Sequence, residues 1–110
     1  MPTPEPQKKW RREMLEQFVA ANPGDAFALY GLAMECANAG DFAAAAAHFN
    51  KLLASHPDYV AAYYQYGQLL GRLGRTAEAR KTLGDGMAVA QRAGNEHARS
   101  EMETALAALG

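Results

Sequence analysis

Residues 25–59 read DAFALYGLAMECANAGDFAAAAAHFNKLLASHPDY, and this stretch decides the fold class. On both sides of Gly40, apolar residues recur every three or four positions, which is the spacing of amphipathic helices. Asp25 and Asp41 can each cap the start of a helix, and Gly40 suits the position just past a helix end. Pro57 stops the second helix. The stretch therefore predicts two antiparallel helices joined by a tight turn.

Similar punctuation on both sides predicts further helices, about six in all. The first covers residues 8–21 and ends before Pro23. The fourth begins near Asp58, Thr76 is a candidate cap for the fifth, and the sixth follows the turn at Gly94. Alanine is abundant and β-branched residues are few, which favours helices over strands. The expected fold class is all-α.

The chain repeats itself every 34 residues. The residue pairs at this spacing are Pro23 and Pro57, Gly40 and Gly74, Ala45 and Ala79, Tyr30 and Tyr64, and Leu15 and Phe49. A period of 34 with two helices per unit is typical of helical repeat arrays, in which neighbouring units bury a shared core.

The chain resembles the tetratricopeptide repeat, whose pattern is W-x2-L-G-x2-Y, then A-x3-F, then P. The first unit has Leu29-x2-Leu32-Ala33-x2-Cys36, Ala45-x3-Phe49 and Pro57, and the second has Tyr63-x2-Tyr66-Gly67-x2-Leu70 and Ala79-x3-Leu83. Leu29 and Cys36 replace aromatic residues, and Gln91 stands where the second closing proline would fall. The resemblance implies an alpha-alpha superhelix, a right-handed array of antiparallel helix pairs.

The resemblance also implies a division of the chain. It predicts a single domain at 8–110, made of an amino-terminal capping helix (8–22), two repeats (25–58 and 59–93) and a carboxyl-terminal capping helix (95–109). Before this domain, three prolines in five residues predict a flexible Pro-rich tail at residues 1–7.

The last helix fits the strict period poorly, because His97, Glu101 and Thr104 would then be buried. A shift of five residues restores the match as Met102-x2-Ala105-Leu106-x2-Leu109. The fifth helix should therefore exceed the third by about one turn.

Several glycines lie inside the predicted helices. Gly84 and Gly86 each cost on the order of 1 kcal/mol relative to alanine, so either the fifth helix bends there or another element approaches closely. Close packing within the array explains Gly67, whereas the sequence offers no reason for Gly71.

No catalytic, cofactor or metal site is expected, and the chain is not expected to be an enzyme. His48, His56 and His97 lack the i, i+4 spacing of a helical metal site, there is no Cys-x-x-Cys, and neither Ser55 nor Ser100 lies in a nucleophile or phosphate-loop motif. Cys36 lies on an apolar helix face, where a small core residue is a simpler interpretation than a reactive thiol.

Charge and composition limit the partners. With 11 Lys plus Arg against 12 Asp plus Glu, the chain gives no reason to expect nucleic-acid or membrane-surface binding. The basic run 8–12 surrounds Trp10, but glutamates lie nearby and Trp10 is more simply a core or lid residue. A single cysteine and the lack of a signal peptide or membrane-spanning run favour a cytoplasmic location.

The resemblance implies a concave groove lined by the first helix of each pair, which takes an extended or helical peptide. The groove positions are Phe27, Tyr30, Met34 and Asn38, followed by Ala61, Tyr64, Gln68 and Arg72. Modules that hold acidic chaperone tails present Lys, Arg and Asn at such places, so a partly apolar peptide is expected here. The alternative is that the terminal helices fill much of this groove.

The predicted function is a non-catalytic interaction module that binds an unidentified protein or peptide as a monomer or weak homodimer. The alternative is a self-associating structural scaffold, with nucleic-acid binding as a lesser possibility. Residues 60–92 carry five basic and two acidic side chains, whereas residues 23–59 carry one basic and four acidic ones. Such a charge dipole would orient a second copy of the chain.

Overall fold

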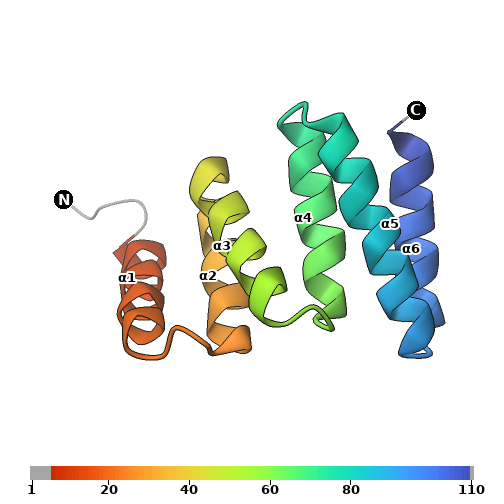
Figure 1. Ribbon diagram of the computed structural model, residues 1–110. Coiled ribbons are helices and arrows are strands. Elements are labelled where there is room, and N and C mark those ends of the chain that lie inside the picture. The colour runs from red at the N-terminus through yellow and green to blue at the C-terminus, as the bar shows by residue number, and fades with distance from the viewer. Residues whose placement is uncertain (1–5, 110) are drawn as a thin grey trace.

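The computed structural model describes residues 6–109, and all its regular secondary structure is helical, as predicted. The elements are α1 (Pro6–Ala21), α2 (Ala26–Asn38), α3 (Phe42–Ser55), α4 (Val60–Arg72), α5 (Thr76–Arg92) and α6 (Glu96–Ala108). They follow one another in chain order along an elongated molecule of 46 × 28 × 21 Å (Figure 1). Each helix packs on its neighbours in sequence, and α4 also contacts α6. None of these helices is long and apolar enough to cross a membrane.

Two aspartates cap helices as predicted. The Asp25 carboxylate accepts a hydrogen bond from the Ala28 amide at 2.9 Å, and the Asp41 carboxylate accepts one from the Ala44 amide at 3.2 Å. Each bond satisfies an amide that has no partner within the first turn of its helix. Between these two helices, Gly40 adopts φ 82°, a left-handed conformation that costs glycine little.

The start of α1 differs from the prediction. The helix begins at Pro6, so residues 6–7 belong to it and not to an extended tail. Proline is well tolerated at the first helical position, because the amide it lacks would have no partner there. Residues 1–5 of the predicted tail lie outside the described residues.

The predicted cap at Thr76 is wrong. Thr76 is the first residue within α5, and Arg75 stands at the cap position without a side-chain bond to the helix. The turn after Gly74 has the same length as the turn after Gly40, so the residue directly after the glycine takes the cap position in both repeats. Arg75 instead donates hydrogen bonds of 2.8 and 2.7 Å to the Glu78 carboxylate.

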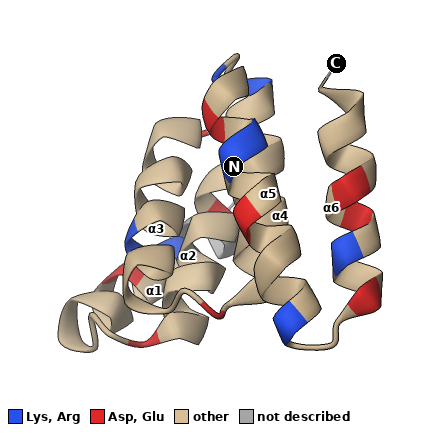
Figure 2. Cartoon of the chain, turned by 45° about the vertical axis from the view of Figure 1, so that its right-hand side comes forward, with Lys and Arg blue, Asp and Glu red and all other residues tan. Residues whose placement is uncertain are grey.

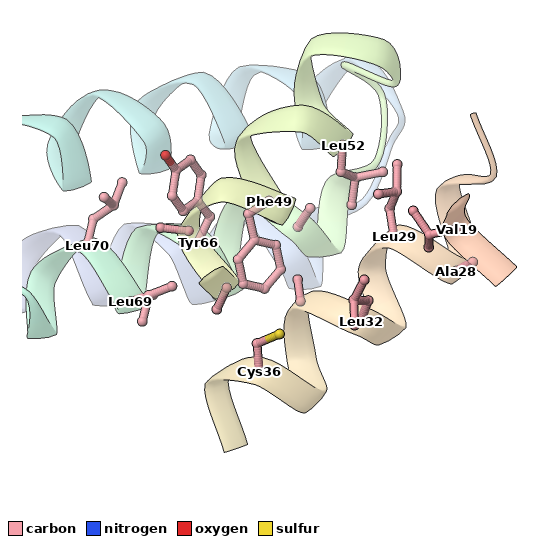
Figure 3. Packing of buried hydrophobic residues seen from close by; sticks show 14 of the residues in the cluster. Val19, Ala28, Leu29, Leu32, Cys36, Phe49, Leu52, Tyr66, Leu69 and Leu70 are labelled. Atoms are coloured by element: carbon pink, nitrogen blue, oxygen red, sulfur yellow. The ribbon is translucent and has the colours of Figure 1, made fainter. Parts of the chain in front are cut away.

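The larger core lies between α2, α3 and α4. Phe49 lies at its centre with 1% of its surface exposed, and its ring stacks on Tyr66 with 5.8 Å between the ring centroids (Figure 3). Cys36 is fully buried on the α2 side of the same cluster. A second, smaller cluster surrounds Met102 and joins α4, α5 and α6. Leu53 and Leu109 pack against both clusters and so connect them along the array.

Glycines mark the places where helices approach most closely. A β-carbon added to Gly67 would lie only 2.5 Å from Leu83 Cδ2. One added to Gly86 would overlap the Tyr63 β-carbon and lie 2.5 Å from the Met102 sulfur, whereas one added to Gly84 would meet nothing within 4 Å. Of the two explanations for the glycines of α5, close approach therefore applies at Gly86.

The carboxyl-terminal part confirms the shifted frame. Helix α5 has 17 residues against 14 in α3, a difference of nearly one turn. As a result Met102 of α6 is fully buried, while His97 and Glu101 face solvent. The structure also explains Gly71, for which the sequence offered no reason. A β-carbon added to Gly71 would lie 3.1 Å from Leu109 Cδ2, so the end of α6 packs closely on α4 at this glycine.

The expectation that Trp10 is a core or lid residue is wrong. Its side chain is 62% exposed, and the neighbouring apolar residues Met14 and Phe18 are 49% and 47% exposed. Of the α1 side chains that the structure describes, residues 10–21, Val19 and part of Leu15 reach the core. The physical reason is that α1 packs on α2 alone, so no described helix covers its other face.

Basic and acidic residues are interspersed along α5 and α6 (Figure 2). Ion pairs within these helices join Lys81 to Asp85 at 3.0 Å and Arg99 to Glu103 at 3.7 Å. Pairs of this kind are exposed and contribute little to stability. The Lys81–Asp85 pair leaves the charge dipole expected from the sequence unchanged, because both side chains are already counted among the charges of residues 60–92.

Substituting the two glycines of α5 should have opposite effects. We expect Gly86→Ala to lower the free energy of unfolding by about 1–3 kcal/mol, because the methyl group overlaps Tyr63 and forces the core apart. Gly84→Ala should raise it by about 0.5–1 kcal/mol through helix propensity alone. Urea unfolding followed by circular dichroism measures both, and an equal effect of the two substitutions would contradict the packing described.

Removing an aspartate cap should matter only where the side chain makes a capping bond. We expect Asp25→Ala to lower the free energy of unfolding by about 1 kcal/mol, because the Ala28 amide loses its partner. Asp58→Ala is the matched control, since the cap position of α4 is Tyr59 and Asp58 makes no capping bond. Thermal unfolding of the two variants compares them, and similar losses would argue against the assigned cap.

Candidate peptide-binding groove

The predicted groove residues lie on the first helix of each pair. Helices α2, α4 and α6 all begin along the same edge of the array, the lower one in Figure 1, and run in the same direction, so their side chains can form one continuous face. On α4, Tyr64, Gln68 and Arg72 are spaced by four residues and therefore share one side of the helix. On α2, Phe27, Tyr30, Met34 and Asn38 follow at spacings of three or four.

A hollow of about 140 Å³ brings four of these residues together. Met34 and Asn38 line it from α2, and Gln68 and Arg72 line it from α4. Its remaining lining residues are Ala37, Phe49, Gln65 and Leu69. The prediction did not include Gln65, although its place on α4 between Tyr64 and Gln68 was a usable signal.

A second hollow of about 400 Å³ lies between α4 and α6. Gln68 and Arg72 also line this one, together with Ala105, Ala108 and Leu109 from the last helix. These two α4 residues therefore form a ridge with a depression on each side. Helix α6 bounds the face and covers part of α4 at Gly71, whereas no residue of α6 lines the hollow between α2 and α4.

The Arg72 guanidinium is held by an aromatic ring. Its central carbon lies 4.7 Å from the ring centroid of Phe42, the first residue of α3. A cation over an aromatic face is attracted by the electron density of the ring, which orients the guanidinium. Phe42 itself is half-buried.

Hydrogen bonding and stacking fix two of the groove tyrosines. Gln68 Nε2 donates a hydrogen bond of 3.1 Å to the Tyr64 hydroxyl. The Tyr30 ring lies 5.3 Å from the Tyr59 ring and 6.2 Å from the Phe49 ring, measured between centroids. Burial raises the pKa of the Tyr30 hydroxyl, and the neighbouring Tyr59 raises it further. Tyr30 is therefore a neutral, half-buried anchor; the sequence prediction did not include Tyr59.

Phe27 differs from the other groove residues because it is 79% exposed. It lies near the start of α2, and neither of the two hollows includes it. The face thus has an aromatic end, formed by Phe27, Tyr30 and Tyr64, and a polar end, formed by Asn38, Gln68 and Arg72. Such a surface offers apolar contact, amide hydrogen bonds and one positive charge.

The face carries groups suited to binding more than to chemistry. Among the described residues, no three His, Cys, Asp or Glu side chains lie together as a metal site would require. Burial raises the pKa of the Cys36 thiol, which keeps it protonated and unreactive in the core. Burial, with a smaller effect of Arg12, lowers the pKa of His48 on α3. Both groups lie away from the two hollows.

Comparison with solved structures finds close matches to the architecture. A tetratricopeptide repeat domain protein from Salinibacter ruber is 36% identical, with 77% of this chain and 94% of that chain covered and a TM-score of 0.74. A protein from Bordetella parapertussis is 28% identical over 89% of this chain and 85% of its own, with a TM-score of 0.77. A comparison with curated proteins finds no match.

A further similar fold is the TPR2B domain of yeast Sti1, solved in complex with pHsp70. It is 20% identical, with 89% of this chain and 78% of that chain covered and a TM-score of 0.83. The sequence profile described as tetratricopeptide repeat matches residues 37–109. Because this match covers more than half of the sequence, the chain belongs to the tetratricopeptide repeat family.

Proposed function

We propose that this chain is a non-catalytic interaction module that binds a partly apolar peptide segment of a partner protein along α2 and α4. The observation that carries the proposal is the arrangement of exposed and half-buried aromatic residues beside a hollow with a mixed polar and apolar lining on one face. Aromatic side chains give large apolar contact area at low entropic cost, and Arg and Gln orient a bound chain through hydrogen bonds.

The comparisons support protein binding in general. The Sti1 domain was solved as a complex with pHsp70, so a domain of this architecture holds a ligand of that kind. At 20% identity, the similarity to the Sti1 domain extends to the fold alone. The ligand class proposed for this chain therefore follows from its own groove residues. With Arg72 as the single positive charge among the predicted groove residues, an acidic chaperone tail is a poor fit.

The aromatic and polar ends of the groove face predict the direction in which a peptide would bind. An apolar residue of the peptide would contact Phe27 and Tyr30, and its backbone would bond to Asn38 and Gln68. A carboxylate or backbone carbonyl would then reach Arg72, which Phe42 holds in place.

We also propose a cytoplasmic location, supported by the single cysteine, which is buried as a free thiol.

Peptide selection from a random display library tests this proposal without knowledge of the natural partner. Peptides retained by the wild-type chain should be partly apolar. Their affinity should fall at least tenfold for Phe27→Ala and for Arg72→Ala, since truncated hot-spot residues commonly cost above 1 kcal/mol. Lys51→Ala is the matched control, because Lys51 is exposed on α3 and lines neither hollow.

Circular dichroism should show that all three variants keep the helical content of the wild type, since the substituted side chains are exposed. Peptides that bind both groove variants as tightly as the wild type would exclude this face. Selection of strongly acidic peptides without apolar residues would refute the proposed ligand class while leaving the groove in place.

A further inference from the structure

A third hollow, of about 370 Å³, lies between α3 and α5, the second helices of the two repeats. We call it the α3–α5 hollow. It shares no lining residue with the two hollows beside the groove residues. Ala43, Ala46 and Ala47 line it from α3, and their small side chains leave the space open. Its occupant is therefore a separate question from the peptide proposed for the groove.

Tyr66 of α4 reaches this hollow with a hydroxyl that has no partner. The residue is only 9% exposed, and in Figure 3 its hydroxyl oxygen points away from the Phe49 ring on which the tyrosine stacks. Among the described residues, this hydroxyl makes no hydrogen bond. One repeat period earlier the position is Leu32, which has no polar atom. A nearly buried hydroxyl without a partner, aimed into a hollow, indicates that something else supplies the bond.

The hydroxyl lies close to the charged rim of the hollow. Burial raises the pKa of Tyr66, while the Arg75 charge lowers it and the Glu78 charge raises it. Both charged residues line the hollow from α5 and its cap position. The hydroxyl therefore stays protonated, and it can donate a hydrogen bond to a group that enters between α3 and α5.

The preceding part of the array shows what fills the equivalent space. There the Arg12 side chain of α1 reaches the Asp41 carboxylate at 2.9 Å and the Glu16 carboxylate at 3.5 Å. The same three positions recur one repeat period later as residues that line the hollow, namely Ala46, Arg75 and Asn50. The α3–α5 hollow is thus the space that remains where an alanine stands in place of an arginine.

The groups around this space are opposite in kind at the two places. Two carboxylates flank the Arg12 guanidinium, whereas the Arg75 guanidinium and the Asn50 side-chain amide flank the hollow. Together with the Tyr66 hydroxyl, these are three hydrogen-bond donors. A carboxylate complements such a set, because its two oxygens accept several bonds and its charge strengthens each of them.

Glu78 leaves room for a second carboxylate on Arg75. It accepts hydrogen bonds of 2.8 Å from Arg75 Nε and 2.7 Å from Arg75 Nη2. A guanidinium has five N–H groups, so its Nη1 side can still donate to another acceptor. Both members of the pair are exposed, and such pairs contribute little to stability. An entering carboxylate can therefore share Arg75 with Glu78 or displace it.

We propose that the α3–α5 hollow binds an acidic side chain, such as a glutamate, of a partner protein. Apart from Ala46 and Tyr66, the residues that line the hollow are exposed, so it is widely open. A free small carboxylate would remain largely in water there. A side chain instead arrives with its own protein surface, which covers the opening and strengthens the bonds beneath it. Binding at this site leaves the residues of the proposed groove accessible.

NMR titration of the full chain with N-acetyl-glutamate N-methylamide tests the proposal. The only charge of this probe is a glutamate side-chain carboxylate. We expect the Asn50 side-chain amide and neighbouring signals to shift, with a dissociation constant on the order of 1–10 millimolar for so small a ligand. The matched probe N-acetyl-glutamine N-methylamide should bind at least about tenfold more weakly, because it lacks the charge.

Two variants of the exposed ion pair should change this affinity in opposite directions. Arg75→Gln should weaken binding of the glutamate probe at least about tenfold, because the charge-assisted bond is lost. Glu78→Gln should strengthen binding, because it removes a competing carboxylate from Arg75. Circular dichroism should show unchanged helical content in both variants, since both side chains are exposed.

Tyr66→Phe separates a binding role of the hydroxyl from a structural one. The variant keeps the ring that stacks on Phe49, so we expect weaker probe binding while the urea midpoint of unfolding stays the same or rises. A lower midpoint would show that the hydroxyl serves the fold, contrary to the proposal.

The remaining outcomes each count against the acidic ligand. Equal binding of the two probes, or weaker binding to Glu78→Gln, would show that the hollow does not select a carboxylate. Affinity unchanged by Arg75→Gln, or shifts confined to other helices, would place the binding elsewhere. A spectrum that does not change up to about 100 millimolar probe would refute the site.

Discussion

The fold depends on one steric constraint, which is that a small residue on one helix must face a large residue on the next. Leu83 occupies the space beside Gly67, and the Tyr63 and Met102 side chains close over Gly86. These contacts bring α4, α5 and α6 together into the second core cluster. Because protein interiors are packed as densely as organic crystals, even one methyl group is too large at such a contact. These close approaches position the α4 and α6 sides of the face that carries the predicted groove residues.

Local features of the sequence explain how much of the structure could be predicted. The repeat period and the helix-ending glycines define the helices, because periodicity and turn chemistry are local properties of the chain. The shifted frame of α6 was also accessible, since the strict period would have buried Glu101. Trp10 was misjudged because an apolar periodicity shows which face is hydrophobic, but not whether another helix lies there to cover it.

The sequence predicted which helix face carries the proposed groove residues, but not the contacts that these residues make. Resemblance to the repeat indicated which helix positions face inward, and the structure gathers Met34, Asn38, Gln68 and Arg72 around one hollow. The contact between Arg72 and Phe42 depends on how α3 and α4 meet, which no short sequence window contains. The role of Gly71 was hidden for the same reason, because Leu109 reaches it from a helix distant in sequence.

Contacts between sequence neighbours have a consequence for the dynamics of this molecule. Apart from α4 with α6, each strong helix contact joins consecutive elements, so native contacts lie close together along the chain. Chains of low contact order fold quickly, because little loop entropy is lost before native contacts form. Opening then begins at the ends of the array, where a helix has a single neighbour to leave. Backbone amides of α1 should exchange with solvent sooner than those of α3, whose neighbours hold it on two sides.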